Sequence, residues 1–154
     1  MYIPIFLFNY FILVEKMLNI WYSIKIRSVI NMVEVVAGII YKDDKFLIAK
    51  RNHNKAQGGL WEFPGGKVEE NETYEEALKR EIKEEFNADV IVEEYIGENI
   101  HHYPEKDIKL MFYKARLVGE EIQLNEHEDY RWINKSDKDN FEFAGADELV
   151  FDLI

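Results

Sequence analysis

The chain has 154 residues, of which 47% are apolar, enough to build one domain with a hydrophobic core. Its 30 acidic residues outnumber its 19 lysines and arginines, and the resulting net charge of −11 argues against DNA or RNA polymers as partners. The lack of cysteine excludes disulfides, Cys-ligated zinc and thiol nucleophiles, and it suits a cytoplasmic protein.

The first 31 residues differ in composition from the rest of the chain. The segment Tyr2–Val14 carries no charge, but it is shorter than the roughly 20 apolar residues that a membrane-spanning helix needs. It also lacks the basic region and the small-residue cleavage site of a secretion signal. We therefore expect residues 1–31 to be an extension outside a functional domain at 32–154, with Met32 as an alternative initiator. A membrane-associating tail and an added helix are the other interpretations.

From residue 33 on, apolar and β-branched stretches alternate with turns and predict strands. The predicted strands are, in chain order, 33–41, 46–51, 60–63, 90–98, 108–117 and 130–133. The breaker Pro64–Gly66 ends the third strand, and a loop at 99–107 that contains His101 and His102 joins the fourth to the fifth. Helices are predicted at 73–86 and 145–154. This order indicates the α/β (α+β) class, with a mixed β-sheet flanked by helices.

The helix at 73–86 carries carboxylates on its apolar side. With about 100° of rotation per residue, Glu81 and Glu85 point in the direction of the apolar stripe, and Glu84 lies at its edge. A buried carboxylate without a partner is unfavourable, and three at this spacing also repel one another. Arg80 supplies one positive charge for three negative ones, so we expect Mg²⁺ or Mn²⁺ to bind here. A solvated acidic face is the alternative.

Two glycines stand shortly before this helix. Gly65 and Gly66 allow the backbone to approach a ligand closely, and an exposed carbonyl there can join the ligand shell of a metal. Glu72 stands at the start of the helix, where its charge favours the helix dipole, so a structural cap explains this residue equally well.

The residues Gly66, Glu72 and Arg80–Ala88 together resemble the Nudix box, Gly-x5-Glu-x7-Arg-Glu-U-x-Glu-Glu-x-Gly-U, in which U is aliphatic. Every position matches except the last glycine, which is Asn87 here, the residue next best suited to a left-handed helix end. The resemblance covers about residues 33–154. It implies the Nudix-type α/β/α sandwich and the Mg²⁺-dependent hydrolysis of nucleoside diphosphates linked to another moiety.

The resemblance also implies roles for single residues. The implied metal ligands in the box are the carbonyl of Gly65 and the carboxylates of Glu81, Glu84 and Glu85. Arg80 would orient the glutamates by ion pairing, and Glu72 would support the box through hydrogen bonds. Either Glu84 or Glu85 would take the proton of the attacking water, unless the metal alone suffices.

Two further stretches, 60–69 and 124–132, resemble the MutT branch of this family, whose members are nucleoside triphosphate pyrophosphohydrolases. In that branch Glu126 matches a late acidic metal ligand, with Glu128 as its rival, and Asp147 matches a residue placed against the base. The expected substrate-binding residues are Arg51, Glu62, Phe63, Gly66, Lys67 and Asp147. A place in the strand core is the alternative for Phe63, and a plain charge at a helix start is the alternative for Asp147. His127 is expected at the surface.

The resemblance implies an enzyme that hydrolyses 8-oxo-dGTP, or a related nucleoside triphosphate, to the monophosphate and pyrophosphate. Within the family, the alternative is a hydrolase that prefers CTP or another nucleoside diphosphate derivative. Outside the enzymes, the alternative is a catalytically silent nucleotide-binding module. The expected partner is a small nucleotide, with no membrane unless the extension tethers the chain, and the expected state is a monomer or homodimer.

Overall fold

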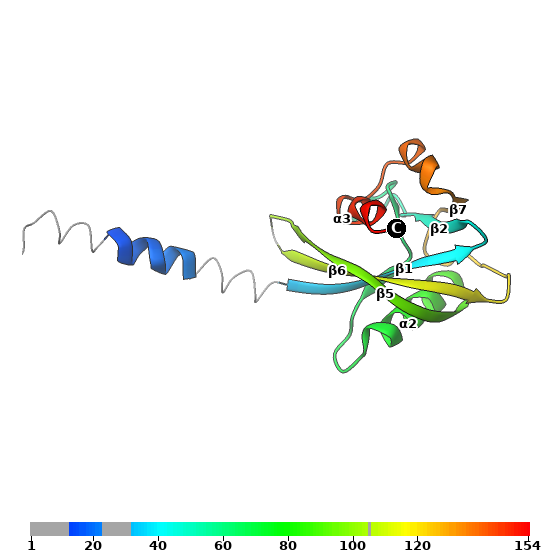
Figure 1. Ribbon diagram of the computed structural model, residues 1–154, viewed down its shortest axis with the longest axis horizontal. Coiled ribbons are helices and arrows are strands. Elements are labelled where there is room, and N and C mark those ends of the chain that lie inside the picture. Colours follow the sequence, from blue (N-terminus) through cyan, green and yellow to red (C-terminus); the bar gives the residue numbers. More distant parts are fainter. Residues whose placement is uncertain (1–12, 23–31, 105) are drawn as a thin grey trace, which may run out of the picture.

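The computed structural model describes residues 13–22, 32–104 and 106–154 (Figure 1). Residues 13–22 form a helix on which Leu13 and Met17 are exposed, and the rest of the expected extension lies outside the described residues. Within the described ranges, no helix is long and apolar enough to cross a membrane. The boundary between extension and domain at residue 32 stays a prediction.

Among the described residues, seven strands form one mixed sheet in the order β3-β2-β1-β6-β5, with β4 paired to β1 and β7 paired to β2. The strands are β1 (Met32–Lys42), β2 (Lys45–Lys50), β3 (Trp61–Glu62), β4 (Gly65–Lys67), β5 (Asp89–His102), β6 (Asp107–Val118) and β7 (Asp129–Ile133). The α-helices are α2 (Tyr74–Phe86) and α3 (Gly145–Glu148), and the 3-10 helices are η1 (Lys135–Asn140) and η2 (Leu149–Asp152). Strands β1 and β6 run parallel, and the other pairs are antiparallel.

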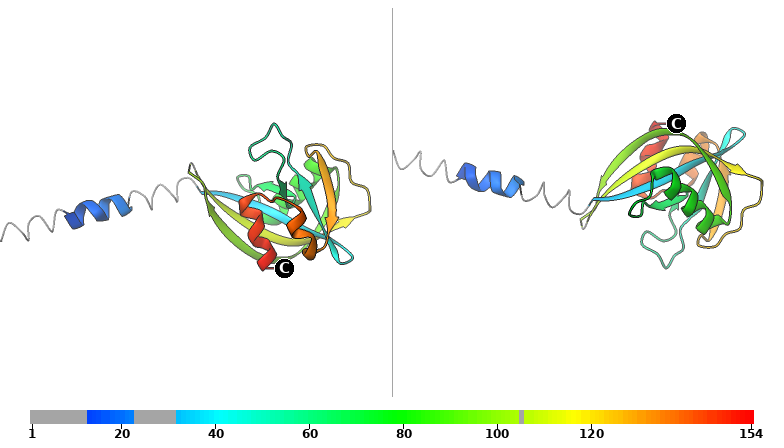
Figure 2. Two further views of the ribbon diagram at one scale, coloured as in Figure 1. Left: turned by 90° about the horizontal axis from the view of Figure 1, so that it is seen from above. Right: turned by 90° about the horizontal axis from the view of Figure 1, so that it is seen from below.

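Side chains of β1 alternate between the two faces of the sheet, as the pleat requires. Val36 and Ile40 belong to a core cluster that includes the apolar side of α2, whereas Ala37 and Ile39 belong to one that includes residues of α3 and η2. The views from above and below show the C-terminal helices on one face of the sheet and α2 on the other (Figure 2). The predicted mixed sheet between helices is therefore confirmed.

Both ends of α2 follow from the local sequence. Thr73 caps the first turn, and the side chain of Glu76 accepts a hydrogen bond from the backbone of Thr73, which completes a capping box. At the other end Asn87 adopts the left-handed conformation, with φ of 49°, and its N–H donates to the carbonyl of Lys83 at 3.0 Å. The replacement of the last glycine of the box therefore preserves the helix end.

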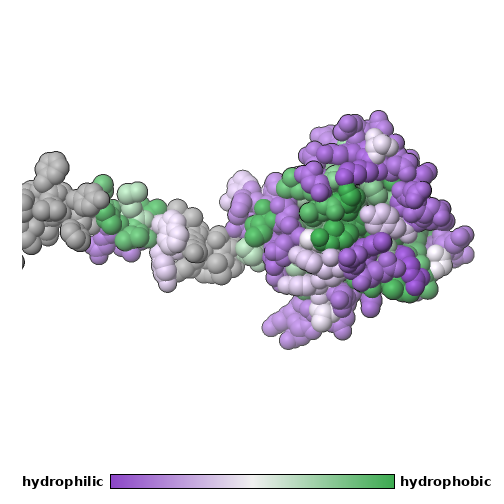
Figure 3. Space-filling view, viewed as in Figure 1, coloured by the Kyte–Doolittle hydropathy of each residue, from purple (hydrophilic) through white to green (hydrophobic). Residues whose placement is uncertain are grey.

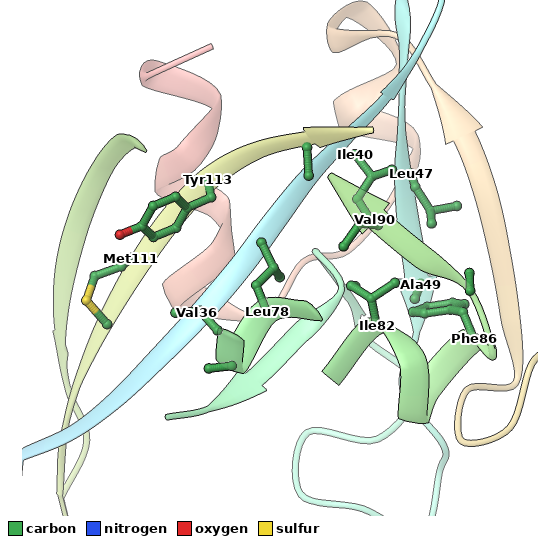
Figure 4. Close-up of a cluster of buried hydrophobic side chains, with 13 residues drawn as sticks. Val36, Ile40, Leu47, Ala49, Leu78, Ile82, Phe86, Val90, Met111 and Tyr113 are labelled. Atoms are coloured by element: carbon green, nitrogen blue, oxygen red, sulfur yellow. The ribbon is translucent and has the colours of Figure 1, made fainter. Parts of the chain in front are cut away.

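The inner side of α2 packs on the sheet through Leu78, Ile82 and Phe86, which are fully buried and point toward the strands (Figure 4). Each such side chain stabilises the fold by about 1.5–3 kcal/mol relative to an exposed one. Gly38 of β1 lies directly under Leu78, and a Cβ there would stand 3.2 Å from the Leu78 methyl carbon. This close packing fixes α2, and the carboxylates that it carries, against the sheet.

The third strand does end before Pro64, as predicted, but Gly65–Lys67 then forms β4 and pairs with β1, a strand that the sequence analysis did not identify. Glycine disfavours strands on propensity alone, but here close backbone approach outweighs propensity. A Cβ on Gly65 would stand 2.0 Å from the carbonyl oxygen of Val36. The two glycines thus let β4 lie against the middle of β1.

Two other expectations are wrong in part. Strand β5 continues through His102, so His101 and His102 lie on the strand, opposite Ile108 and Asp107, rather than in a loop. The ring Nδ1 of His102 lies 2.8 Å from an oxygen of Asp107, a contact that the local pattern does not reveal. The predicted helix at 145–154 is divided into α3 and η2.

The surface of the domain is mostly hydrophilic in the view of Figure 3, in keeping with the net charge of −11. Apolar residues gather near the C-terminus, where Leu149 and Leu153 are exposed. A Cβ on Gly97 of β5 would stand 3.0 Å from a methyl carbon of Leu153. The C-terminal segment therefore packs directly on β5.

Candidate active site

The carboxylates of α2 occupy three different environments, as their rotation about the helix predicts. Glu85 is buried, the side chain of Glu81 is 16% exposed, and that of Glu84 is 54% exposed. Desolvation raises the pKa of Glu85 well above its ordinary value, and the nearby charges of Glu62 and Glu81 raise it further. Desolvation also raises the pKa of Glu81, although Arg80 opposes this effect. This side of α2 therefore favours a bound cation.

Glu81, Glu84 and Glu85 form an acidic cluster, and Arg80 binds Glu81 of this cluster together with Glu72. Its Nε and Nη2 donate to the two carboxylate oxygens of Glu72 at 2.8 and 2.9 Å, a bidentate pair that lowers the pKa of Glu72. Its Nη1 donates to Glu81 at 2.9 Å, and Nη2 also donates to the carbonyl of Lys67. The same Nη1 lies 3.6 Å from Glu84, beyond hydrogen-bond distance. Arg80 thus ties α2 to β4 and to Glu72.

The glycines of β4 bring the backbone against these carboxylates. The N–H of Gly65 donates to Glu85 at 3.2 Å. A Cβ on Gly66 would stand 2.3 Å from the carboxylate carbon of Glu81, so the carboxylate occupies the space that any larger side chain would fill. The Gly65 backbone has φ of 151°, a conformation that side chains with a Cβ rarely adopt. Both glycines are therefore required by the geometry of the site.

The donor set fits a hard divalent cation in chemistry and in charge. Carboxylate oxygens are the ligands that Mg²⁺ and Mn²⁺ prefer, and the desolvated Glu85 lies among like charges that a cation would neutralise. Within residues 13–22, 32–104 and 106–154, no three His, Asp or Glu side chains converge on one point. The reason is visible in their contacts, since Glu81 turns to Arg80 and Glu85 to the N–H of Gly65.

The loop before β7 brings Glu126 to the edge of this cluster. Its charge contributes to the raised pKa of both Glu81 and Glu85, while its own side chain pairs with Lys55. The rival Glu128 faces away, toward the backbone N–H and the ring of His53. Of these two glutamates, the geometry therefore favours Glu126 as a neighbour of the α2 carboxylates.

A pocket of about 550 Å³ opens beside β4 and is lined by all six residues that the sequence singled out for substrate binding. Those residues are Arg51, Glu62, Phe63, Gly66, Lys67 and Asp147. Gln57, Tyr103 and Lys106 also line it, although the sequence analysis did not identify them. They come from a polar loop and from the far end of the β5–β6 hairpin, where no local pattern marks a binding residue.

Asp147 is buried in this pocket and does not act as a plain charge at the start of α3. Its Oδ1 accepts a hydrogen bond from the backbone N–H of Phe63 at 3.0 Å. Desolvation, with a smaller contribution from Glu62, raises the pKa of Asp147 to about 8. The carboxyl group is therefore mainly protonated at neutral pH and can both donate and accept hydrogen bonds.

The ring of Phe63 confirms the alternative of a strand-core position. It is 2% exposed and lies 5.6 Å from the ring of Phe46 and 5.6 Å from that of Phe151. Its backbone N–H still holds Asp147. Phe63 thus contributes to the pocket by positioning Asp147 and by closing its apolar wall.

The expectation that His127 lies at the surface is wrong, because its side chain is only 4% exposed. The preceding loop folds over the end of α2, where the N–H of Gln123 donates to the backbone carbonyl of Phe86 and that of Asn125 to the backbone carbonyl of Glu85, both at 2.9 Å. This brings the His127 ring into a stack on Phe86, with centroids 5.3 Å apart. These hydrogen bonds join residues far apart in sequence, so local polarity does not predict them.

The family described as NUDIX domain matches residues 35–153, which include the acidic side of α2, both glycines of β4 and Asp147. The chain belongs to the NUDIX family. As a Nudix hydrolase of the MutT type, it has the family's arrangement of a mixed sheet between helices. The match leaves out the helix at 13–22.

Named relatives and solved structures agree with this Nudix assignment. The CTP pyrophosphohydrolase of Escherichia coli is 36% identical over 117 residues, which are 76% of this chain and 87% of the relative. The 8-oxo-dGTP diphosphatase of Buchnera aphidicola subsp. Schizaphis graminum is 36% identical over 125 residues, 77% of this chain and 91% of the relative. The solution structure of the E. coli ORF135 protein is similar with a TM-score of 0.72 and 35% identity, covering 80% of this chain and 88% of that one.

Proposed function

We propose that this Nudix hydrolase is a Mg²⁺-dependent nucleoside triphosphate pyrophosphohydrolase that converts 8-oxo-dGTP, or a related nucleoside triphosphate, to the monophosphate and pyrophosphate. The observation that carries the proposal is the position of β4, which has the acidic cluster of α2 against it and also lines the pocket. A nucleotide in that pocket would place its phosphates near the carboxylates. The names of the two relatives support the same class of reaction.

The residues would divide the chemistry between them. When bound, Mg²⁺ would neutralise phosphate oxygens and lower the pKa of the water that attacks phosphorus. The groups proposed to hold it are the carbonyl of Gly65 and the carboxylates of Glu81, Glu84, Glu85 and Glu126.

Arg80 would keep Glu81 in place without taking part in proton transfer, since its own contacts are with Glu72, Glu81 and the backbone. Among Glu81, Glu84 and Glu85, Glu84 is the most exposed, and it lies beyond hydrogen-bond distance from Arg80. One of its oxygens would hold Mg²⁺ and the other would stay open to accept the proton of the water, which makes Glu84 the favoured base.

The pocket offers complementary groups for the rest of the nucleotide. Arg51 and Lys67 supply positive charge at its wall, which suits phosphate oxygens. The protonated Asp147 offers one donor and one acceptor, a pairing that suits the edge of a base which carries both kinds of group. We further expect the enzyme to act on free nucleotides in the cytoplasm, as a monomer or homodimer.

Preference for CTP is the second candidate within the family. It is favoured by the similarity to the E. coli CTP pyrophosphohydrolase, which covers 87% of that relative. The donor and acceptor of Asp147 could serve a cytosine edge as well as a purine edge. Base preference is therefore the quantity that an experiment must determine.

A kinetic panel tests the proposal. Release of the nucleoside monophosphate would be measured with 8-oxo-dGTP, dGTP, CTP, dCTP and a nucleoside diphosphate sugar, each with Mg²⁺ and with EDTA. We expect the highest kcat/KM with 8-oxo-dGTP and no turnover in EDTA. A higher kcat/KM for CTP would select the second candidate, and preference for the sugar nucleotide would overturn both. Tight nucleotide binding without hydrolysis would identify a catalytically silent module.

A further inference from the structure

His127 lies in the wall between the acidic cluster and the pocket, although it lines neither the pocket nor the expected metal site. Its Nε2 is 2.9 Å from Oε1 of Glu62 and 3.9 Å from Oε1 of Glu85. The ring is stacked on Phe86, at an interplanar angle of 10°. Of these two glutamates, only Glu62 therefore lies within hydrogen-bond distance of the ring, through its Oε1.

The two ring nitrogens of His127 differ in their surroundings. Nδ1 is buried and has no hydrogen-bond partner among the described residues. A buried N–H without a partner is less favourable than a buried lone pair without one. The geometry thus assigns the hydrogen to Nε2, so His127 donates a hydrogen bond to the carboxylate of Glu62.

The other oxygen of Glu62, Oε2, pairs with Nη1 of Arg51. The carboxylate is therefore held at both oxygens, by Arg51 on one side and by His127 on the other, and its side chain is only 12% exposed. Each oxygen keeps a further lone pair that could accept from a ligand. Since Glu62 lines the pocket, its orientation decides where that acceptor points.

We propose that His127 is a positioning residue for substrate binding, which acts by orienting the Glu62 carboxylate so that this carboxylate accepts a hydrogen bond from the nucleotide. The proposal rests on the proposed function and adds to it a residue that touches neither substrate nor metal. The competing explanation is that His127 serves only to fill space beside Phe86.

Two amide variants separate these explanations. The amide nitrogen of His127→Gln can reach the position of Nε2, whereas that of His127→Asn is one methylene too short. At saturating Mg²⁺, we expect His127→Asn to raise KM for the preferred nucleotide about tenfold, the loss expected for a hydrogen bond to a charged group. We expect kcat to stay within about twofold and His127→Gln to restore KM to within about threefold of wild type.

A double-mutant cycle tests whether His127 acts through Glu62. Glu62→Gln alone should raise KM, and adding His127→Asn should change KM by less than about twofold more, because the group being oriented has already been altered. Multiplied effects on KM would overturn the proposal. The midpoint of the Mg²⁺ activation curve should stay unchanged in His127→Asn, and a shifted midpoint with an unchanged KM would also overturn it.

The remaining outcomes are distinguishable from failure of the proposed function. If the wild type hydrolyses no nucleotide, the proposed function is wrong. If the wild type is active and His127→Asn has the wild-type KM, only the present inference is wrong. An equal rise in KM for the Gln and Asn variants would assign the effect to ring volume and overturn the inference as well. Should circular dichroism show that His127→Asn is unfolded, His127→Phe keeps a ring on Phe86, lacks the donor and gives the same comparison.

Discussion

At the scale of single residues, surroundings decide what each glutamate of the Nudix box can do. Glu72 receives two hydrogen bonds from Arg80, which lower its pKa. Glu85 is desolvated among like charges, so its pKa is raised. Glu84 is exposed and beyond hydrogen-bond distance from Arg80. One residue type thus supplies a structural anion, a site for a cation and a candidate base.

The exposure of Glu84 leads to the first prediction. Glu84→Gln should leave the melting temperature near that of wild type, because the side chain is largely solvated. It should lower kcat by about 10²- to 10⁴-fold, the usual contribution of a general base. Pyrophosphate release at saturating Mg²⁺ measures the effect. Glu75→Gln, an exposed change on the same helix, is the control, and near wild-type turnover of Glu84→Gln would exclude this role.

Asp147 leads to a prediction about pH. Its folded-state pKa of about 8 lies above the ordinary value of 3.8, so the folded protein keeps a proton that the unfolded chain loses between these values. The contribution of Asp147 to the free energy of unfolding is therefore complete below about pH 4. It declines by about 1.4 kcal/mol per pH unit until the pH passes the folded-state pKa.

Asp147→Asn has no such proton, so it isolates this contribution. Between about pH 5 and about pH 8, the free energy of unfolding of Asp147→Asn should increase relative to that of wild type. Urea unfolding followed by circular dichroism at several pH values measures the difference. Parallel pH profiles for the two proteins would show that Asp147 titrates normally.

At the scale of elements, the end of α2 and the strand β4 depend on unusual backbone positions. Asn87 closes the helix in the left-handed region, and its side chain donates to Gln123 at 3.2 Å. Gly65 and Gly66 allow β4 to lie between β1 and the carboxylates of α2. At both places the required backbone conformation, rather than helix or strand propensity, decides which residue is suitable.

The helix end can be tested by two substitutions. Asn87→Ala should lower the free energy of unfolding by about 1 kcal/mol, because a residue with a Cβ is disfavoured in the left-handed region. Asn87→Gly, which restores the family's residue, should change it by less than about 0.5 kcal/mol. Chemical denaturation gives both values. A larger loss for Gly than for Ala would mean that the contact with Gln123, rather than the backbone, controls this position.

The two glycines of β4 should behave differently from each other. In Gly66→Ala the new Cβ meets the flexible end of Glu81, so the fold should survive while the carboxylate is displaced. We expect the Mg²⁺ concentration for half-maximal activity to rise about tenfold, as for other changes that disturb the orientation of metal ligands. Gly65→Ala meets backbone at 2.0 Å and should be the less stable variant. An unchanged Mg²⁺ requirement in Gly66→Ala would remove Glu81 from the site.

At the scale of the whole molecule, the sandwich brings acidic side chains close together around Glu85, where their like charges repel one another. Glu85 is buried against the sheet by the same packing that buries Leu78 and Phe86. A cation that binds only the folded state therefore stabilises the entire domain. Binding and folding are coupled through the position of α2.

Mg²⁺ should accordingly raise the melting temperature of the wild type by several degrees, since a ligand at 100 times its Kd contributes about 2.7 kcal/mol. Glu85→Gln should melt higher than wild type in EDTA, because it removes a buried charge, and should gain little from Mg²⁺. Differential scanning calorimetry in EDTA and in Mg²⁺ checks both parts, with Glu75→Gln as the control. Equal gains for Glu85→Gln and wild type would place the cation elsewhere.

The sequence by itself determined the helix at 73–86, its inward carboxylates and the strands of the mixed sheet, because periodicity and spacing act over a few residues. Only the tertiary structure decided that the His127 side chain is buried, that Gly65–Lys67 is a strand, and that the backbone N–H of Phe63 donates to Asp147. Those contacts depend on strand register and on loops that fold over distant elements, and neither is encoded in any local pattern. The local sequence thus identified the candidate reactive groups, and long-range packing placed the carboxylates of α2 against β4, which also lines the pocket.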